Sequence, residues 1–332
     1  MKKKILIKDI AEAAGVSSAL VSYVMNNKSE EARVSTRTAE RIRRIAKEMN
    51  YQPNQVAKSL KSGKSFSIGL IVTDISNPFF GRLARLIENE SNIEGYTVLF
   101  GSSDENAERA HQLIDTLVNR QIDGIIIVPA AGSENQLKYL SEMNIPFVLL
   151  DRYFEDIESS YVVIDNFKAT YQATRILLER GHEKIGLVRY KSDLKHTVDR
   201  FLGYKKALEE EDKYNDGKFI CKVGYEDMDS FSKEFKMLIE KGVDAIMFST
   251  NTLSIRGLKM LKKEKIKVPD KVDVFCFDQN VSYDLFYYPI SYVKQPLDLI
   301  AHEAVRLLLR KIYRKEDYQE KIVLNPEIVK KI

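Results

Sequence analysis

The sequence predicts a small all-α head followed by an α/β body of two doubly wound parallel-sheet lobes. Residues 1–64 show only helix-like apolar spacing, whereas short apolar strand-like runs alternate with amphipathic helices from Ser67 onward. That alternation then repeats in a second stretch of similar length. Continuous apolar strands between helices are typical of parallel sheets that are covered on both faces.

The composition is that of a globular protein of two or three domains. The 332 residues are 44% hydrophobic and 30% charged, which argues against a disordered or fibrous chain. No apolar run approaches the ~20 residues that cross a bilayer, and the apolar stretch near Met1 is too short for a secretory signal. Cys221 and Cys276 are too few and too far apart for a disulfide framework or a zinc site. We therefore expect a cytoplasmic protein without a metal or other cofactor.

The net charge of +4 conceals an asymmetry between head and body. Residues 1–64 contain 14 Lys and Arg against 6 Asp and Glu, a net charge of +8, while the remainder contains 38 against 42 and is slightly acidic. A basic head suggests binding to a polyanion such as DNA. The alternative is a basic tail that is merely solvated. Whether the head has the fold of a DNA-binding domain distinguishes the two.

The head has the spacing of a helix-turn-helix. This motif needs a small residue where its two helices touch, a glycine at the tight turn and a branched apolar residue on the second helix. Ala11, Gly15 and Val21 supply these in order. A third helix is predicted over residues 36–49, with Ser35 as its N-cap. Together with the charge, this pattern favours DNA binding over an unrelated three-helix core.

The second helix of such a motif enters the major groove through its N-terminal part. The candidate DNA contacts on and beside it are Ser17, Ser18, Ala19, Ser22, Tyr23 and Asn26. Ser17, Ser22 and Asn26 suit phosphate oxygens, Tyr23 and Ser18 can reach base edges, and Ala19 can contact a thymine methyl group. Each of them can equally be an ordinary exposed surface residue.

A short helix is predicted between head and body. Asn54 can cap the run 55–61, which Ser62 and Gly63 end. A helix this short is marginal on its own, so a disordered linker is the alternative.

Polar residues that follow the predicted strands are the candidate ligand contacts, because such sheets bind ligands beyond the carboxyl ends of their strands. Strands are predicted at 68–72, 97–100, 124–128, 146–150, 161–164, 185–189, 219–223, 244–248 and 272–277. The polar residues after them are Asp74, Asn77, Ser102, Ser103, Asp151, Arg152, Lys191, Asp193, Asn251 and Asp278. Asp and Asn after strands also serve as helix caps, which is the competing interpretation for each.

Several sequence blocks resemble the lactose/galactose repressor family over nearly the whole chain. In the head these blocks are Ile7-Lys-Asp-Ile-Ala-Glu-Ala-Ala-Gly-Val-Ser, Val21-Ser-x-Val-Met-Asn-Asn, Val34-Ser-x-x-Thr and Asn50-Tyr-Gln-Pro-Asn. In the body they are Asp74-Ile-Ser-Asn-Pro-Phe-Phe, Asp151-Arg, Arg180-Gly-His, Arg200-x-x-Gly-Tyr and Lys294-Gln-Pro. The resemblance implies a core that is similar to periplasmic sugar-binding proteins.

The resemblance also implies roles for individual residues. Leu60, with Ala57 beside it, would enter the minor groove from a pair of hinge helices in a dimer. Arg200, Asn251 and Asp278 would bind ligand hydroxyls or a carboxylate. Tyr225 would stack on the ligand, and Gln295 would lie near the hinge strands.

Some residues depart from the family pattern. Leu6 replaces the usual Ser or Thr cap of the first helix, and Tyr23 replaces a frequent Arg or His, so the operator sequence cannot be carried over. Thr252 and Gln279 stand at positions that are commonly acidic. Lys191 and Lys195 hint at an anionic ligand such as a sugar acid.

We predict four parts: a helix-turn-helix domain (1–50), a hinge (51–65), a first lobe (66–164 with 296–323) and a second lobe (165–295 with 324–332). The expected function is a dimeric repressor of carbohydrate-related genes that binds a pseudo-palindromic operator and a sugar or sugar acid. A solute-binding protein without a transcriptional role is the alternative. An enzyme is not expected, because none of the nucleotide-binding, metalloprotease or hydrolase motifs occurs.

Overall fold

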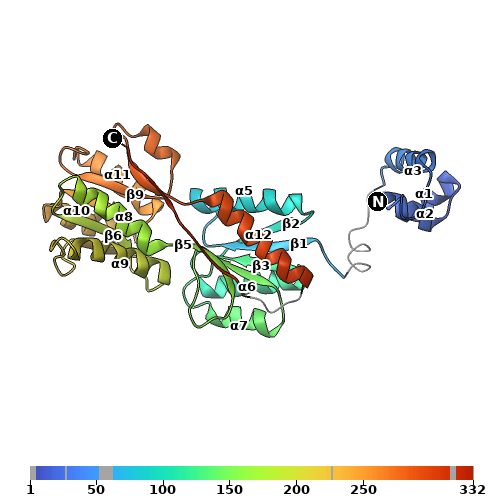
Figure 1. The fold of residues 1–332 in the computed structure, drawn as a ribbon, viewed down its shortest axis with the longest axis horizontal. Helices are drawn as coiled ribbons and strands as arrows, with labels where there is room; N and C mark the ends of the chain where they lie inside the picture. Colours follow the sequence, from blue (N-terminus) through green and yellow to red (C-terminus); the bar gives the residue numbers. More distant parts are fainter. Residues whose placement is uncertain (1–4, 27, 52–62, 226, 315–318, 332) are drawn as a thin grey trace. The chain divides into compact units, whose positions relative to one another are not determined.

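The computed structural model describes residues 5–26, 28–51, 63–225, 227–314 and 319–331. The chain divides into two compact units, Met1–Ser65 and Phe66–Ile332 (Figure 1). Each unit is described by itself below. None of the helices in these ranges is long and apolar enough to cross a membrane.

In the described part of the head unit, three helices surround a small apolar core, as the sequence predicts. They are α1 (Ile7–Ala14), α2 (Ser18–Met25) and α3 (Thr36–Glu48). Ile10, Val21, Val24 and Ile42 are fully buried and pack together with the small residues Ala11, Ala14, Ala39 and Ala46. The alanines allow the three short helices to approach closely, which a core this small requires.

Local interactions fix where the head helices begin and end. Gly15 ends α1 at φ 62°, a left-handed conformation that favours glycine. Ser17 caps α2 by accepting a hydrogen bond from the Leu20 N–H at 3.2 Å, and Ser35 caps α3 by accepting one from the Thr38 N–H at 3.3 Å. At α1, where Leu6 has no side-chain acceptor, the Asp9 carboxylate accepts a hydrogen bond from the Leu6 N–H at 2.7 Å. Half of a capping box thus replaces the missing cap.

The first lobe is a six-stranded sheet with the strand order β11-β5-β4-β3-β1-β2. Its strands are β1 (Ser67–Val72), β2 (Thr97–Ser102), β3 (Gly124–Ile127), β4 (Phe147–Leu150), β5 (Ser160–Ile164) and β11 (Lys321–Leu324). Its helices are α5 (Pro78–Ile93), α6 (Ala107–Asn119), α7 (Glu134–Glu142) and α12 (Leu297–Arg314). α5 and α12 lie side by side on one face, and α6 and α7 cover the other (Figure 1).

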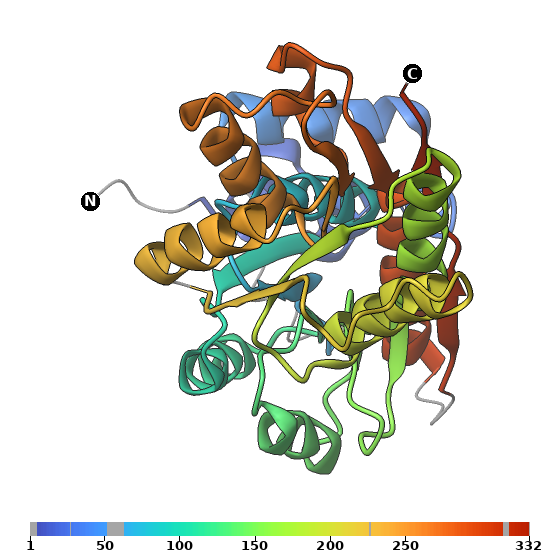
Figure 2. The ribbon, with the colours of Figure 1, turned by 90° about the vertical axis from the view of Figure 1, so that its left-hand side faces the viewer.

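The second lobe repeats this plan with the order β12-β10-β9-β8-β6-β7. Its strands are β6 (Ile185–Tyr190), β7 (Ile220–Val223), β8 (Ala245–Phe248), β9 (Asp273–Phe277), β10 (Ser291–Lys294) and β12 (Glu327–Val329). Its helices are α8 (Asn166–Glu179), α9 (Lys195–Glu209), α10 (Met228–Glu240), α11 (Asn251–Lys263) and the 3₁₀ helix η1 (Val281–Leu285). Figure 2 shows α8 and α9 on one side of this sheet and α10 and α11 on the other.

Alternate residues of each buried strand face opposite helix layers. In β8, Ala245 and Met247 pack with α8 and α9, whereas Ile246 and Phe248 pack with α10 and α11. Both sets are apolar, which explains why these strands are continuous apolar runs in the sequence. The predicted pair of doubly wound lobes is confirmed. One ladder differs, because the edge strand β12 pairs antiparallel with β10.

The chain passes between the two lobes three times. It crosses after β5, again between β10 and α12, and finally between β11 and β12. The second crossing carries Gln295 and Pro296, and the third carries Asn325. Because all three crossings join the same two sheets, the lobes can change their angle only by bending these short segments.

Candidate functional site

A cavity of about 520 Å³ lies between the carboxyl ends of the two sheets. Both lobes contribute to its wall. The lining residues are Thr73, Asp74, Asn77, Phe79, Phe80, Asp104, Glu105, Asp151, Arg152, Tyr190, His196, Arg200, Tyr225, Thr250, Asn251, Thr252, Arg256, Asp278 and Gln295. Its size suits a small organic molecule of the sugar or nucleobase scale.

Nine of the ligand contacts predicted from the sequence line this cavity, whereas Ser102, Ser103, Lys191 and Asp193 do not. Those brought together are Asp74, Asn77, Asp151, Arg152, Arg200, Tyr225, Asn251, Asp278 and Gln295. Ser102 and Ser103 do not line it. The Ser102 hydroxyl accepts a hydrogen bond from the Ile75 N–H, and the Ser103 hydroxyl is buried against the Val72 carbonyl.

Lys191 does not line the cavity, which corrects its prediction as a ligand contact. β6 runs through Tyr190, so the tyrosine takes the cavity position and Lys191 falls beyond it with an exposed side chain. Lys195 is not in the lining either, because its ammonium group binds Asp199 at 2.8 Å and lies 3.7 Å from Glu155. Neither lysine therefore supports an anionic ligand.

Asp151 and Asp278 occupy equivalent places in the two lobes. Each directly follows the third strand in its sheet order, β4 or β9, and each has φ 65°. Gln295 donates a hydrogen bond to the Asp278 carboxylate at 2.7 Å. Burial raises the pKa of Asp278 to about 6, although Arg200 and Gln295 favour its ionised form. Asp151 and Asp278 thus form a matching pair of carboxylates in the cavity wall, one from each lobe.

Arg200 is a buried guanidinium held in a fixed orientation. Its Nε donates to Asn166 Oδ1 and its Nη1 to the Ser249 carbonyl, both at 2.7 Å, and it lies 3.7 Å above the ring of Phe277. Burial lowers its pKa, while Asp278 and Asp151 oppose that shift. Within the described residues its Nη2 has no hydrogen-bond partner. That nitrogen is a donor positioned for a ligand oxygen.

Asn77 and Asn251 bind each other across the cavity. The Asn251 amide donates to Asn77 Oδ1 at 2.9 Å, which joins the start of α11 in one lobe to the start of α5 in the other. Asn77 also caps α5 through the Phe79 N–H at 3.1 Å. Asn77 therefore both caps α5 and lines the cavity.

Aromatic side chains enter the cavity wall from both lobes. Tyr190 and Tyr225 stack with their ring centroids 4.1 Å apart, and Phe79 and Phe80 meet edge to face at 4.9 Å. Burial raises the pKa of Tyr225 to about 12, so it stays a neutral hydroxyl at physiological pH. These surfaces can pack against the apolar face of a ring-shaped ligand.

His196, which the sequence analysis did not select, also lines the cavity. It lies one helical turn before Arg200 in α9 and is 5% exposed. Burial lowers its pKa well below the ordinary value, and Arg152 and Arg200 lower it further. It is therefore a neutral donor or acceptor. The four-residue spacing from Arg200 is the sequence feature that could have revealed it.

Glu105, Tyr190, Thr250 and Arg256 are further lining residues that were missed. Tyr190 is the last residue of β6 and Thr250 follows β8 by two residues, so the expectation that ligand contacts lie at the carboxyl ends of strands applies to them as well. Glu105 lies in the loop before α6 and Arg256 lies within α11, so neither follows a strand end and the sequence gives no indication of either.

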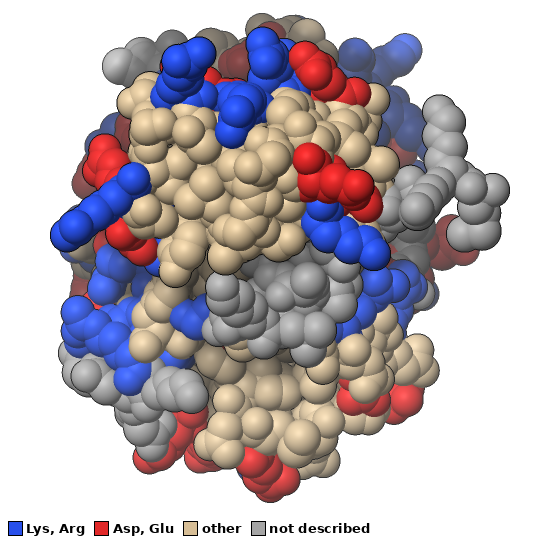
Figure 3. Space-filling model, turned by 90° about the vertical axis from the view of Figure 1, so that its right-hand side faces the viewer, with Lys and Arg blue, Asp and Glu red and all other residues tan. Residues whose placement is uncertain are grey.

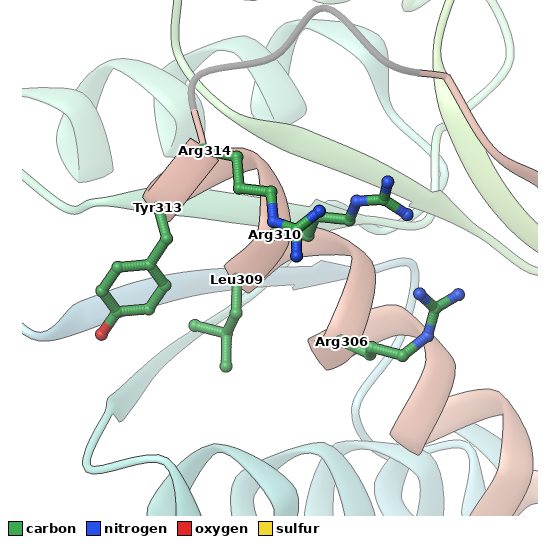
Figure 4. A pocket seen from close by; sticks show the side chains of 5 residues that line it. All are labelled: Arg306, Leu309, Arg310, Tyr313 and Arg314. Atoms are coloured by element: carbon green, nitrogen blue, oxygen red, sulfur yellow. The ribbon is translucent and has the colours of Figure 1, made fainter.

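A separate cavity lies on α12 and is formed by Arg306, Leu309, Arg310, Tyr313 and Arg314 (Figure 4). Glu320 binds Arg306 at 2.6 Å and Arg310 at 3.3 Å, and Glu303 binds Arg306 at 2.6 Å. The charge of these two arginines is thus largely compensated by the protein itself. This cavity lies near the amino ends of the strands, where Tyr313 contacts Tyr96 directly before β2, so it is not the candidate ligand site.

The predicted DNA contacts form an exposed face of the head. Ser17, Ser18, Ala19, Tyr23 and Asn26 are exposed, and Ser22 is half-buried. Asn26 donates to the Ser22 carbonyl at 2.7 Å, which closes the end of α2. The exposed basic residues of the head are Lys8, Lys28, Arg33, Arg37, Arg41, Arg43, Arg44 and Lys47. Figure 3 shows lysine and arginine side chains, with acidic side chains among them, around the edges of a largely uncharged surface.

The remaining three predicted DNA contacts, Asn54, Ala57 and Leu60, lie outside the described residues.

Comparison with known proteins identifies the family. Residues 6–54 match the profile of the bacterial regulatory proteins of the lacI family, and residues 174–331 match a periplasmic binding protein-like domain. The transcriptional regulator RegA of Clostridium saccharobutylicum is 30% identical over 335 residues, 98% of each chain. The ribose operon repressor of Halalkalibacterium halodurans is 32% identical over 311 residues, 93% of this chain and 91% of that one. This chain belongs to the LacI family.

The solved structures agree with that assignment at the level of the fold. The lac repressor dimer bound to operator and the anti-inducer ONPF superimposes with a TM-score of 0.86, at 20% identity over 99% of this chain and 98% of that one. The complex of the regulator CelR with cellobiose has a TM-score of 0.73, at 23% identity over 98% and 99%. As a LacI-family member, the protein is a DNA-binding transcriptional regulator and not an enzyme.

Proposed function

We propose that the protein is a cytoplasmic, dimeric repressor whose affinity for a pseudo-palindromic operator is set by a sugar-like effector in the interlobe cavity. The cavity carries this proposal, because both lobes supply polar groups to it, so a ligand that binds groups of both lobes favours the lobe angle at which it can do so. One relative, the ribose operon repressor, supports a sugar as the effector. The solved lac repressor supports a dimer on operator DNA.

In this proposal the chain has a helix-turn-helix domain at 1–50, a hinge at 51–65 and the two lobes as predicted. Ser17, Ser22 and Asn26 contact phosphates, and Ser18, Ala19 and Tyr23 face bases. Asn54, Ala57 and Leu60 belong to the hinge contact with DNA. Asp151, Arg200 and Asp278 bind effector hydroxyls, with Asp74, Asn77, Arg152, Asn251 and Gln295 around them and Tyr225 against the ring.

The alternative function, solute binding without transcription, lacks support because the LacI match covers the head itself. Thermal unfolding in the presence of neutral sugars, sugar acids and phosphosugars tests the effector part of the proposal. A ligand at 100 times its dissociation constant stabilises the native state by about 2.7 kcal/mol, which a melting curve resolves. The same compound must then change binding of the protein to DNA from its own promoter region. A ligand that stabilises the protein and leaves DNA binding unchanged contradicts the proposal.

A further inference from the structure

Arg152 is bound inside the cavity by a carboxylate of the protein itself. Its Nη1 and Nη2 donate to Glu105 Oε2 and Oε1 at 2.8 and 3.1 Å. Arg152 is 4% exposed, and both residues line the cavity. Two parallel bonds of this kind are the geometry in which arginine binds a ligand carboxylate or phosphate. Glu105 therefore occupies the face of Arg152 that an anionic ligand would need.

The loop that carries Glu105 is anchored on both sides. The Asp104 N–H donates to the Thr73 carbonyl at 2.7 Å, and the Asp104 carboxylate pairs with Arg109. Asn106 caps α6 by accepting a hydrogen bond from the Arg109 N–H at 2.9 Å. Asp104 and Glu105 have φ 51° and 53°, a left-handed backbone that residues other than glycine keep only where surrounding contacts fix it. Glu105 is thus held against Arg152.

The other charges of the cavity also disfavour an anion. Its lining carboxylates outnumber its arginines: they are Asp74, Asp104, Glu105, Asp151 and Asp278, against Arg152, Arg200 and Arg256. Arg200 has Asp278 and Asp151 as electrostatic neighbours, and Arg256 donates to the Tyr225 carbonyl at 3.4 Å. An anionic ligand would enter a lining of net negative charge, and the desolvation of its own charge would be poorly compensated.

We propose that Glu105 is a specificity-determining residue that fills the anion-binding face of Arg152 and restricts the effector to molecules without an anionic group, namely neutral polyols or amino sugars. This inference rests on the proposed function of the cavity as the effector site. Its consequence is that Glu105→Gln turns Arg152 into a receptor for a carboxylate or phosphate.

The experiment compares the wild type, Glu105→Gln and the control Glu108→Gln, which removes the same charge from an exposed position in the first turn of α6. The probes are D-gluconate and inorganic phosphate, against sodium chloride of equal ionic strength, with binding measured by calorimetry and melting temperature. We expect Glu105→Gln to bind both anions at least tenfold more tightly than either other protein. Equal anion binding by the two variants, or tight anion binding by the wild type, would overturn the inference.

Glu105→Gln also leaves the guanidinium of Arg152 with less compensation, so it can unfold the protein. In that case the readout is refolding in phosphate: recovery supports the inference, and failure to recover contradicts it. Glu105→Asp keeps the charge and is expected to gain no anion binding. Failure of the proposed function can be told apart from failure of this inference. If the proposed function is wrong, no cavity ligand alters operator binding, whether or not the variants bind the anions.

Discussion

At the scale of single residues, the cavity combines buried acceptors and donors whose charge states are set by their surroundings. Asp278 is 6% exposed and bonded to Gln295, Arg200 is fixed by Asn166 and Ser249, and His196 is held neutral. A buried polar atom without a hydrogen-bond partner costs free energy, and within the described residues His196 Nδ1 is such an atom. A ligand that completes the bonds of these groups gains both affinity and orientation.

Asp278 makes effector binding dependent on pH. Its pKa in the folded protein is about 6, and the ionised carboxylate is the form that accepts ligand hydroxyls. Effector affinity should therefore be constant well above pH 6 and fall by up to about tenfold per unit below it. Calorimetric titration between pH 5 and 8 measures this, and Asp278→Asn should flatten the profile. An unchanged profile in that variant would assign the titration to another group.

Tyr23 should determine sequence discrimination rather than overall affinity for DNA. Its side chain is 44% exposed on α2, where it can reach a base edge. Tyr23→Ala should lower specific operator affinity by about 1–3 kcal/mol while leaving binding to an unrelated duplex nearly unchanged. Fluorescence anisotropy with both duplexes at one salt concentration separates the two effects. Equal losses on both duplexes would mean that Tyr23 contacts the backbone only.

At the scale of secondary structure elements, two features hold the second lobe together. α8 and α9 touch at Gly203, where an added Cβ would lie 2.2 Å from the Phe167 carbonyl oxygen. Asp273, at the start of β9, binds Arg180 at 2.8 Å and His182 at 3.1 Å, and Arg180 also donates to Ser291. These contacts fix α9 and β9, the elements that carry Arg200 and lead to Asp278.

Gly203→Ala should destabilise the protein strongly. The obstacle is backbone of the neighbouring helix, so no side-chain rotation relieves it and the two helices must separate. We expect a loss of about 1–3 kcal/mol or more in the free energy of unfolding, measured by urea denaturation. The control is Lys206→Ala on the exposed side of α9, whose surface ion pair with Glu210 is worth little. A Gly203→Ala protein as stable as this control would contradict the packing.

Asp273 should couple stability to acid pH. Burial opposes its ionisation, but hydrogen bonds from His182, Arg180 and the Val274 N–H outweigh this and lower its pKa. Its stabilising contribution is thus fully present above the ordinary pKa of ~3.9 and is lost as pH falls through the lower folded value. Asp273→Asn should destabilise the protein at pH 7 by about 1–3 kcal/mol and make unfolding less sensitive to acid. The exposed Asp270→Asn serves as control; matching acid sensitivity in both variants would refute this role.

The sequence predicted elements better than it predicted the contacts of individual side chains. Strands such as β8 are buried on both faces, so their apolar runs are visible without tertiary information. β10, β11 and β12 are not among the predicted strands, because β10 is a short Ser-Tyr-Val-Lys run, β11 is a four-residue strand that alternates exposed and half-buried residues, and β12 has only three residues. The expectation that polar residues after strands contact the ligand identified Asp151 and Asp278. It wrongly placed Lys191 in the cavity, because β6 was predicted to end at residue 189 and in fact ends at Tyr190. It missed Glu105, whose partner Arg152 is 47 residues away in sequence.

At the scale of the whole molecule, three chain crossings join the two lobes and restrict the angles that the lobes can adopt relative to each other. The bond between Asn77 and Asn251 spans the lobes directly, and Lys195 lies 3.7 Å from Glu155 of the first lobe. A ligand can strengthen or replace such contacts. It shifts the equilibrium between two lobe arrangements only as far as it binds one arrangement more tightly than the other. For a coupling of about 1–3 kcal/mol, operator DNA must alter effector affinity by the same factor.

The most direct test of this coupling is the operator dissociation constant of the full-length protein, measured with and without a saturating cavity ligand, for the wild type and for Asp278→Ala. The account predicts that the ligand changes the wild-type constant by about 5–150-fold, whereas Asp278→Ala binds the operator as the wild type does without ligand and no longer responds. A variant that still responds normally to the ligand would contradict control of DNA binding from this cavity.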